Sequence, residues 1–319
     1  MIFKFREYVI YEMIKFPVRC SLVWNSKKDW KVIYHKDDIA NNLDYITEVK
    51  LREIGRTIKI SGKIKNNYCK VVKDDKIPRK IMRSPLLKSN LQKAIRLGKI
   101  EEALVTALNL IQIDFFNFVR RLIIISIEDV GVVLNNLPLL SFLLMSHQNI
   151  EINNEIIQEL LITVFTLCRY PNKHIPESDN CELDYSKYDY NDPLIVSLII
   201  ASEYGGFKGD IRLYKRMINS PNKVILNVKK GNLVLTRGIK KIDILPASID
   251  HHCYPWIIQY ITDRIDLEGD TVKSLIWNNS SKINFREEHT MMDKKVWKNV
   301  TKIQREFIKQ IMSKIALRD

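Results

Sequence analysis

The chain has 319 residues, of which 46% are apolar, and its 51 Lys and Arg outnumber its 37 Asp and Glu to give a formal net charge of +14. Such a chain can bury two or three hydrophobic cores, and its charge favours polyanionic partners such as nucleic acid. Five scattered cysteines without a CxxC pair argue against a disulfide framework or a zinc ribbon, and the apolar runs are shorter than the roughly 20 residues of a membrane span.

The first 85 residues are expected to form a basic α+β unit. Apolar and polar residues alternate in two runs, 18–24 and 30–34, and a polar segment between them gives the pattern of a β-hairpin. Ile58 and Ile60 ahead of Gly62 favour another short strand. We expect the Ser84-Pro85 step to close this unit.

Positive charge is concentrated in this part of the chain, since residues 50–88 hold 13 basic and 3 acidic side chains. A field of this kind attracts phosphates by releasing their counterions, and by itself it carries no sequence specificity. The sequence therefore predicts a nucleic-acid-binding segment here. The expected phosphate contacts are Lys50, Arg52, Arg56, Lys59, Lys63 and Lys65, extended by Lys73, Lys76, Arg79, Lys80 and Arg83.

From residue 86 to residue 175 the apolar residues recur every three or four positions, which predicts a bundle of antiparallel helices with short links. The clearest apolar stripe runs from Ile100 to Ile111, and a second one covers 115–123. Gly98 is expected to end the first helix of the bundle, because glycine readily adopts the left-handed conformation found after a helix C-terminus.

An acidic, Tyr-rich connector is expected at 176–192, followed by a C-terminal domain of helices and a hairpin at 193–319. Asp192 followed by Pro193 predicts a helix start, because the carboxylate caps free N–H groups and proline fits the first turn. A terminal helix near 296–315 is expected to pack on its own domain and keep its lysines in water. The whole chain is predicted to be α+β, with helices predominant.

Several short segments of the helical middle resemble one known family. They are the run Ser89 to Gly98 followed by Ala103-Leu104, then Arg120-Arg121-Leu122, Glu128-Asp129-Val130-Gly131 and Pro171-Asn172-Lys173. Their order and spacing resemble the helical region that follows the motor in the replication-associated recombination AAA+ ATPases (RarA/MgsA type). The similarity is confined to residues 86–175.

In that family these helices build an oligomerisation collar, so the resemblance implies a collar-like scaffold for self-association or for docking to replication or repair proteins. The ATPase core of the family is absent, because the sequence has no GxxxxGK[ST] phosphate loop and no acidic Walker-B strand. We therefore expect no nucleotide cofactor. Charged residues 120, 121, 128 and 129 are expected to pair within the bundle, with a ligand role as the alternative.

A glycine-rich loop between two expected helices is a weaker candidate for a phosphate site. Gly205 and Gly206 permit positive φ, and their N–H groups would lie close to Lys208. A tight helix-to-helix turn is the favoured alternative, because no strand precedes the loop as a phosphate loop requires. A polar stretch at 278–286 is likewise expected to be a solvated loop, with phosphate binding as the alternative.

Asp250, His251, His252 and Cys253 form the densest group of metal-ligating residue types in the chain. Adjacent side chains are expected to point apart, so a catalytic metal would need another ligand from a distant segment. The sequence candidates for that ligand are His174, Glu287 and His289. We expect none of them to approach this group, and we expect His251 and His252 to point in different directions.

The sequence thus favours a non-catalytic, nucleic-acid-binding accessory protein of DNA replication or repair, in a reducing, intracellular compartment. Its expected partners are nucleic acid, replication or repair proteins, and further copies of the chain. A rival is a metal-dependent nuclease or phosphohydrolase built around Asp250, His251 and His252. A third alternative is a structural scaffold protein whose charge serves solubility.

Overall fold

The computed structural model of the chain is predominantly helical. The residues it describes are 18–25, 29–35, 44–51, 56–62, 84–130, 136–146, 152, 154–170, 192–204, 208–219, 242–252, 254–281 and 291–316. Among the helices within these ranges, none is both long enough and apolar enough to cross a membrane.

The chain forms two compact units whose segments alternate along the sequence. Unit 1 comprises Met1–Val72, Phe115–Thr166 and Asn172–Leu233, and unit 2 comprises Lys73–Asp114, Leu167–Pro171 and Val234–Asp319. Two helices, α3 (Ile100–Ile125) and α5 (Asn154–Arg169), contribute residues to both units. The domain boundaries predicted at residues 85, 175 and 192 stay predictions.

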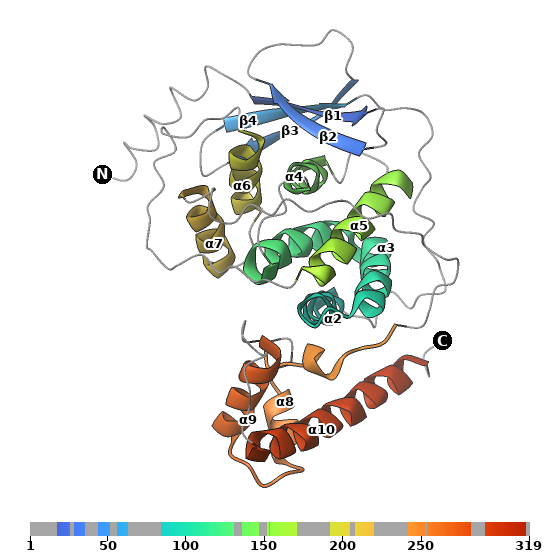
Figure 1. Cartoon of the computed structure of the whole chain (residues 1–319), viewed down its shortest axis with the longest axis vertical. Helices are drawn as coiled ribbons and strands as arrows, with labels where there is room; N and C mark the ends of the chain where they lie inside the picture. The colour runs from blue at the N-terminus through green and yellow to red at the C-terminus, as the bar shows by residue number, and fades with distance from the viewer. Residues whose placement is uncertain are drawn as a thin grey trace. The chain divides into compact units, whose positions relative to one another are not determined.

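Unit 1 contains a four-stranded sheet with the strand order β2-β1-β4-β3 (Figure 1). The strands are β1 (Val18–Asn25), β2 (Asp29–His35), β3 (Asp44–Leu51) and β4 (Arg56–Gly62). β1 pairs antiparallel with β2 and parallel with β4, and β3 pairs antiparallel with β4. Residues 1–17 and 63–83 lie outside the described residues, so an α+β unit spanning residues 1–85 stays a prediction.

Two helices pack on the sheet of unit 1, α4 (Leu137–Ser146) and α6 (Pro193–Glu203), as Figure 1 shows. Nearly every described side chain of both helices is buried, because they lie between the sheet and other helices. The Ser141 hydroxyl donates a 3.1 Å hydrogen bond to the Ser197 carbonyl and so joins α4 to α6. Helix α7 (Lys208–Asn219) packs on α6 and on η1 (Ser126–Val130), a π-helical turn that continues α3.

The predicted start of α6 is confirmed. Asp192 has extended backbone angles, its carboxylate accepts a 2.9 Å hydrogen bond from the Leu194 N–H group, and Pro193 occupies the first turn. The two apolar stripes predicted at 100–111 and 115–123 fall on the two halves of α3. Between them the helical backbone is interrupted at Asp114, where φ is −154° and ψ is 73°, at the boundary between the two units.

Unit 2 is built from α2, the first part of α3, and the C-terminal third of the chain. Its further elements are α2 (Ser84–Arg96), η4 (Pro246–Ser248), α8 (Ile257–Thr262), α9 (Gly269–Ile276), η5 (Trp277–Ser281) and α10 (Met291–Ala316). α2 is buried on almost every side, including polar Asn90, Gln92, Lys93 and Arg96.

The end of α2 is the predicted one. Gly98 has φ of 65°, its N–H group donates to the Ile95 carbonyl, and the next N–H group, of Lys99, donates to the Ala94 carbonyl. These two bonds form the Schellman motif, which satisfies carbonyl groups that the helix leaves free. The glycine after α2 is therefore confirmed as a helix stop.

The terminal helix is longer than predicted but packs as predicted. α10 turns Val300, Ile303 and Phe307 into unit 2, where it contacts α8, α9 and η4. The polar stretch predicted as a loop at 278–286 is wrong in its first part, because residues 277–281 form the helical turn η5. The predicted connector up to residue 191 and the hairpin near 224–235 lie outside the described residues.

Candidate functional site

A polar cluster in unit 2 fastens the segment around η4 to α2. Its centre is the Asn90 side chain, which is fully buried. Its amide nitrogen donates to the Thr106 hydroxyl at 2.8 Å and to the Asp243 carbonyl at 3.0 Å. Its oxygen accepts from the Leu245 N–H group at 2.9 Å and from the Ser248 hydroxyl at 2.7 Å. One side chain of α2 thus determines where residues 243–248 lie.

A buried ion pair continues this cluster one helical turn further along α2. The Lys93 ammonium lies 3.0 Å from Oδ2 of Asp250, and the two side chains are only 7% and 3% exposed. The other carboxylate oxygen of Asp250 accepts a 3.0 Å hydrogen bond from the His252 N–H group. From the other side, the Gln304 amide of α10 donates to the Ile249 carbonyl at 2.7 Å. Asp250 therefore fixes the chain in unit 2, and its carboxylate is buried rather than open to a metal or substrate.

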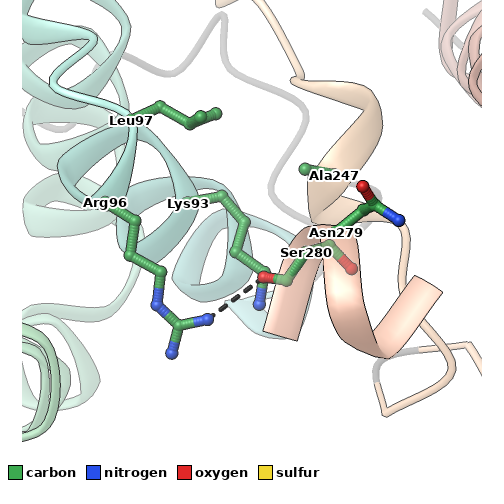
Figure 2. A pocket seen from close by; sticks show the side chains of 6 residues that line it. All are labelled: Lys93, Arg96, Leu97, Ala247, Asn279 and Ser280. Atoms are coloured by element: carbon green, nitrogen blue, oxygen red, sulfur yellow. Dashed lines mark hydrogen bonds between the residues drawn. The ribbon is translucent and has the colours of Figure 1, made fainter. Parts of the chain in front are cut away.

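A small hollow of about 10 Å³, the space of roughly one water molecule, lies next to Lys93, and Figure 2 shows the side chains that line it. Its lining residues are Lys93, Arg96 and Leu97 from α2, Ala247 from η4, and Asn279 and Ser280 from η5. The Arg96 guanidinium is buried and donates a 3.1 Å hydrogen bond to the Ser280 carbonyl. The hollow is too small for a nucleotide, and the Arg96–Ser280 hydrogen bond at its edge joins α2 to η5.

The two adjacent histidines do not point in different directions, and that prediction is wrong. The His251 and His252 ring centroids lie 4.1 Å apart with the planes tilted by 35°. The Trp277 ring lies 6.2 Å from His251 and 5.5 Å from His252. The backbone turns at residues 251–252, two residues after η4 has ended, and the two consecutive rings lie on the same side. These three residues are called the ring cluster below.

The ring cluster is open to solvent at one end. Trp277 is 43% exposed and His252 is exposed, whereas His251 is half-buried. Burial lowers the pKa of His251 below its usual value, and the neighbouring His252, Lys273 and Lys93 lower it further, against the opposing effect of Asp250. The lowered pKa favours the neutral form of the His251 imidazole. Its Nδ1 atom is buried and makes no hydrogen bond with the part of the protein that the structure describes.

Within the described ranges, the structure does not assemble a metal site around Asp250, His251 and His252. Among the described residues, no three His, Cys, Asp or Glu side chains lie close enough together to hold a metal ion. The sequence candidates for distant ligands, His174, Glu287 and His289, lie outside the described residues, and so does Cys253.

Only some of the phosphate contacts predicted in the N-terminal segment of residues 50–83 fall within the described residues. In the strand register, Lys50 of β3 lies opposite Thr57 of β4. Lys59 of β4 lies opposite Glu48 of β3 on one side and opposite Arg19 of β1 on the other. Arg56 begins β4. The contacts that fall outside the described residues are Arg52, Lys63, Lys65, Lys73, Lys76, Arg79, Lys80 and Arg83.

The glycine-rich loop lies between two helices, as its sequence suggests. α6 ends at Glu203, Tyr204 follows as its C-cap, and α7 begins at Lys208. Gly205 and Gly206 fall outside the described residues, so a phosphate-binding role for them and for Lys208 stays a prediction.

The charged residues expected to pair in the bundle lie around a buried tyrosine of unit 1. Tyr214 of α7 is 1% exposed, and burial, together with Asp210 and Glu128, raises the pKa of its hydroxyl. Arg120 and Arg121 of α3 oppose that shift. Three of the four charged residues, Arg120, Arg121 and Glu128, therefore act on the same buried hydroxyl of unit 1, and their pairing with one another stays a prediction.

A row of cations covers the solvent side of α10. The exposed members are Lys294, Lys295, Lys298, Lys302, Arg305 and Lys309. At 3.6 residues per turn they fall within an arc of about 100°, opposite the buried Val300, Ile303 and Phe307. The row spans about 22 Å along the helix, since each residue adds about 1.5 Å. We call it the α10 cation row.

Comparison with protein-family models, with curated proteins and with solved structures finds no match. The function of the chain is therefore argued from its own residues, and the resemblance of residues 86–175 to an ATPase collar stays a prediction.

The polar residues of α2 that hold the η4 and η5 segments were not identified from the sequence, and neither was Trp277. Lys93 and Arg96 are polar positions of a helix, and such positions are ordinarily predicted to face water. Asn90 bonds to residues more than 150 positions away, which no local pattern reveals. The only signal for Trp277 was its place directly ahead of a polar stretch, where a buried tryptophan would be unusual.

Proposed function

We propose that this protein is a non-catalytic, nucleic-acid-binding accessory protein of DNA replication or repair. The observation that supports this most is the α10 cation row, an exposed line of positive side chains on a helix whose other side is anchored in unit 2. A rigid row of this length holds several phosphates at once and releases their counterions on binding. The net charge of +14 acts in the same direction over longer distances.

The predicted basic segment of residues 50–83 is part of the same proposal. Its lysines and arginines provide phosphate contacts in addition to those of α10. They belong to the proposed basic α+β unit of residues 1–85. Residues 86–175 provide a collar-like scaffold, through which the protein associates with itself or with replication or repair proteins in a reducing, intracellular compartment. The resemblance to the AAA+ collar region supports this second part, and the α10 cation row supports only the first.

The nuclease rival is the weaker account of residues 250–252. A catalytic carboxylate must reach a metal or a reacting water. Asp250 instead uses one oxygen for Lys93 and the other for the His252 N–H group, and it is 2% exposed. We therefore assign Asp250 a structural role.

A salt titration tests the nucleic-acid proposal. For duplex DNA the logarithm of the binding constant falls with the logarithm of salt concentration by about 0.9 per neutralised phosphate. Replacing Lys298 and Lys302 with Gln should therefore flatten the slope by about 1.8. Replacing Lys59, Lys63 and Lys65 with Gln should flatten it by up to about 2.7 if the N-terminal segment contributes.

The matched control replaces two other exposed cations, Lys99 and Arg212, with Gln. This variant loses the same net charge but leaves the α10 cation row intact, so its slope should change much less. Fluorescence anisotropy with labelled duplex and single-stranded oligonucleotides measures all the variants. The proposal fails if the wild-type chain binds neither oligonucleotide at low salt.

A further inference from the structure

The ring cluster of His251, His252 and Trp277 lies outside every nucleic-acid contact expected from the sequence. We propose that it is a stacking site for an unpaired base of a single-stranded nucleic acid. This inference rests on the proposed function and deepens it, because it names the class of strand that unit 2 binds and the side chains that hold it.

The geometry of the rings is the first argument. Two segments that are 25 or more positions apart in sequence bring three rings together, with centroid separations between 4.1 and 6.2 Å. Trp277 is 43% exposed although it is the largest apolar side chain of η5. Leaving such a ring in water forgoes the stabilisation that its burial would supply. A flat ligand that covers Trp277 would recover it.

The charges around the rings favour a nucleic acid as that ligand. Lys273 lies one helical turn before Trp277, is exposed, and is close enough to act on the His251 ring, as Lys93 also is. Asp250 is the acidic residue that acts on the same ring, and its carboxylate is held by Lys93 at 3.0 Å. Sites that bind single strands combine aromatic rings for the bases with cations for the backbone.

The exposed Trp277 ring favours single strands over double strands as the ligand. The His251 and His252 ring centroids lie 4.1 Å apart and both rings flank the exposed Trp277 ring, so the three rings together offer an aromatic surface to a base. In a duplex the faces of the bases are covered by their neighbours, and exposing one face costs a few kcal/mol. An exposed ring therefore gains from an unpaired base and gains little from a duplex.

The test compares three probes of equal length on the full chain: an oligothymidine of about 12 nucleotides, its duplex, and an abasic oligomer with the same phosphates. Trp277→Ala should weaken binding of the oligothymidine by about tenfold or more, because base–aromatic stacking is worth that much per base. Its binding of the duplex and of the abasic oligomer should stay at the wild-type level. Trp277→Phe should retain most of the affinity.

Trp256→Ala is the matched control, since Trp256 is 49% exposed and packs on Phe307 and Tyr254 instead of on histidines. It should leave all three affinities unchanged. Wild-type protein should also bind oligothymidine more tightly than the abasic oligomer, by about the factor that Trp277→Ala removes. If Trp277→Ala does not fold, this comparison of the two probes on the wild-type protein still tests base stacking. Binding by Trp277→Phe and by Lys273→Gln provides two further measurements.

The inference is overturned if Trp277→Ala weakens all three probes equally, since a structural role would do that. It is also overturned if Trp277→Ala changes the binding of none of the probes. In both cases wild-type binding with a steep salt dependence would leave the proposed function standing. If wild-type protein binds no probe at all, the proposed function itself fails.

Discussion

Burying the Lys93 ammonium and the Asp250 carboxylate removes several kcal/mol of hydration free energy from each group. The attraction between the two charges offsets only part of this loss. The pair is nevertheless informative, because either charge without the other would cost far more. Conformations in which residues 243–250 leave α2 are therefore strongly disfavoured. The four hydrogen bonds of Asn90 act in the same way on the same segment.

Removing one charge of this pair tests its role directly. Asp250→Asn keeps the side-chain volume and an oxygen for the His252 N–H group, but it leaves the Lys93 ammonium buried against a neutral amide. We expect the free energy of unfolding to fall by about 3–5 kcal/mol. Urea unfolding followed by circular dichroism measures this change.

The exposed Asp266→Asn is the control and should change stability by less than about 0.5 kcal/mol. In the double variant Lys93→Met/Asp250→Asn, the loss should be smaller than the sum of the two single losses, because the unpaired charge is gone. Strict additivity would mean that the two side chains do not depend on each other.

Among the elements, α2 is the one on which unit 2 is arranged. It is buried on almost every side, and its residues reach η4, η5 and the segment that precedes η4. Its C-terminus must therefore stop at a fixed residue, since a longer helix would carry the chain away from the start of α3 at Ile100. Gly98 provides that stop.

The position of Gly98 leads to a stability prediction. At φ of 65° an alanine is strained, and its Cβ would lie 3.3 Å from the Cys168 carbonyl oxygen. Gly98→Ala should therefore lower the free energy of unfolding by about 1–2 kcal/mol. Gly209→Ala is the control, because a Cβ there meets nothing within 4 Å in the first turn of α7. It should be neutral or stabilise by up to about 1 kcal/mol, as thermal unfolding of both variants will show.

The same elements show how far sequence reasoning reaches. Gly98 and the Asp192-Pro193 start of α6 were predictable, because helix ends are determined by neighbouring residues. The buried cations of α2 were not, since polar residues on a helix are expected in water and their partners come from the far end of the chain. The sequence of η5 predicts a loop, because asparagine and serine favour turns. In the structure the Asn279 and Ser280 side chains instead donate hydrogen bonds to backbone carbonyls one helical turn earlier.

For the molecule as a whole, the proposed collar-like role of residues 86–175 predicts self-association or partner docking. Leu97, Trp256 and Trp277 are the large apolar side chains exposed in the part of the chain that the structure describes. Leu97 belongs to residues 86–175, the segment that resembles an oligomerisation collar. A single exposed leucine is ordinary on a protein surface, so the expectation of self-association rests on the resemblance and Leu97 is the side chain chosen to test it.

Light scattering at micromolar concentration should therefore show a species larger than the 37.5 kDa single chain. Leu97→Gln removes the apolar contact without adding charge and should shift the distribution towards the single chain. Trp256→Ala should not, because it lies outside the collar-like segment. A single chain at every concentration would leave partner docking as the only role for that segment.

The alternation of the two units along the sequence limits how the protein can be divided. Each unit draws on three separated stretches of chain, and α3 and α5 cross from one unit to the other without a break in the peptide. A gene truncated at residue 85, 175 or 192 would encode parts of both cores and the whole of neither. Each shortened chain should therefore be insoluble when expressed alone, whereas two complementary fragments produced together contain all the segments of both cores and can fold as a complex.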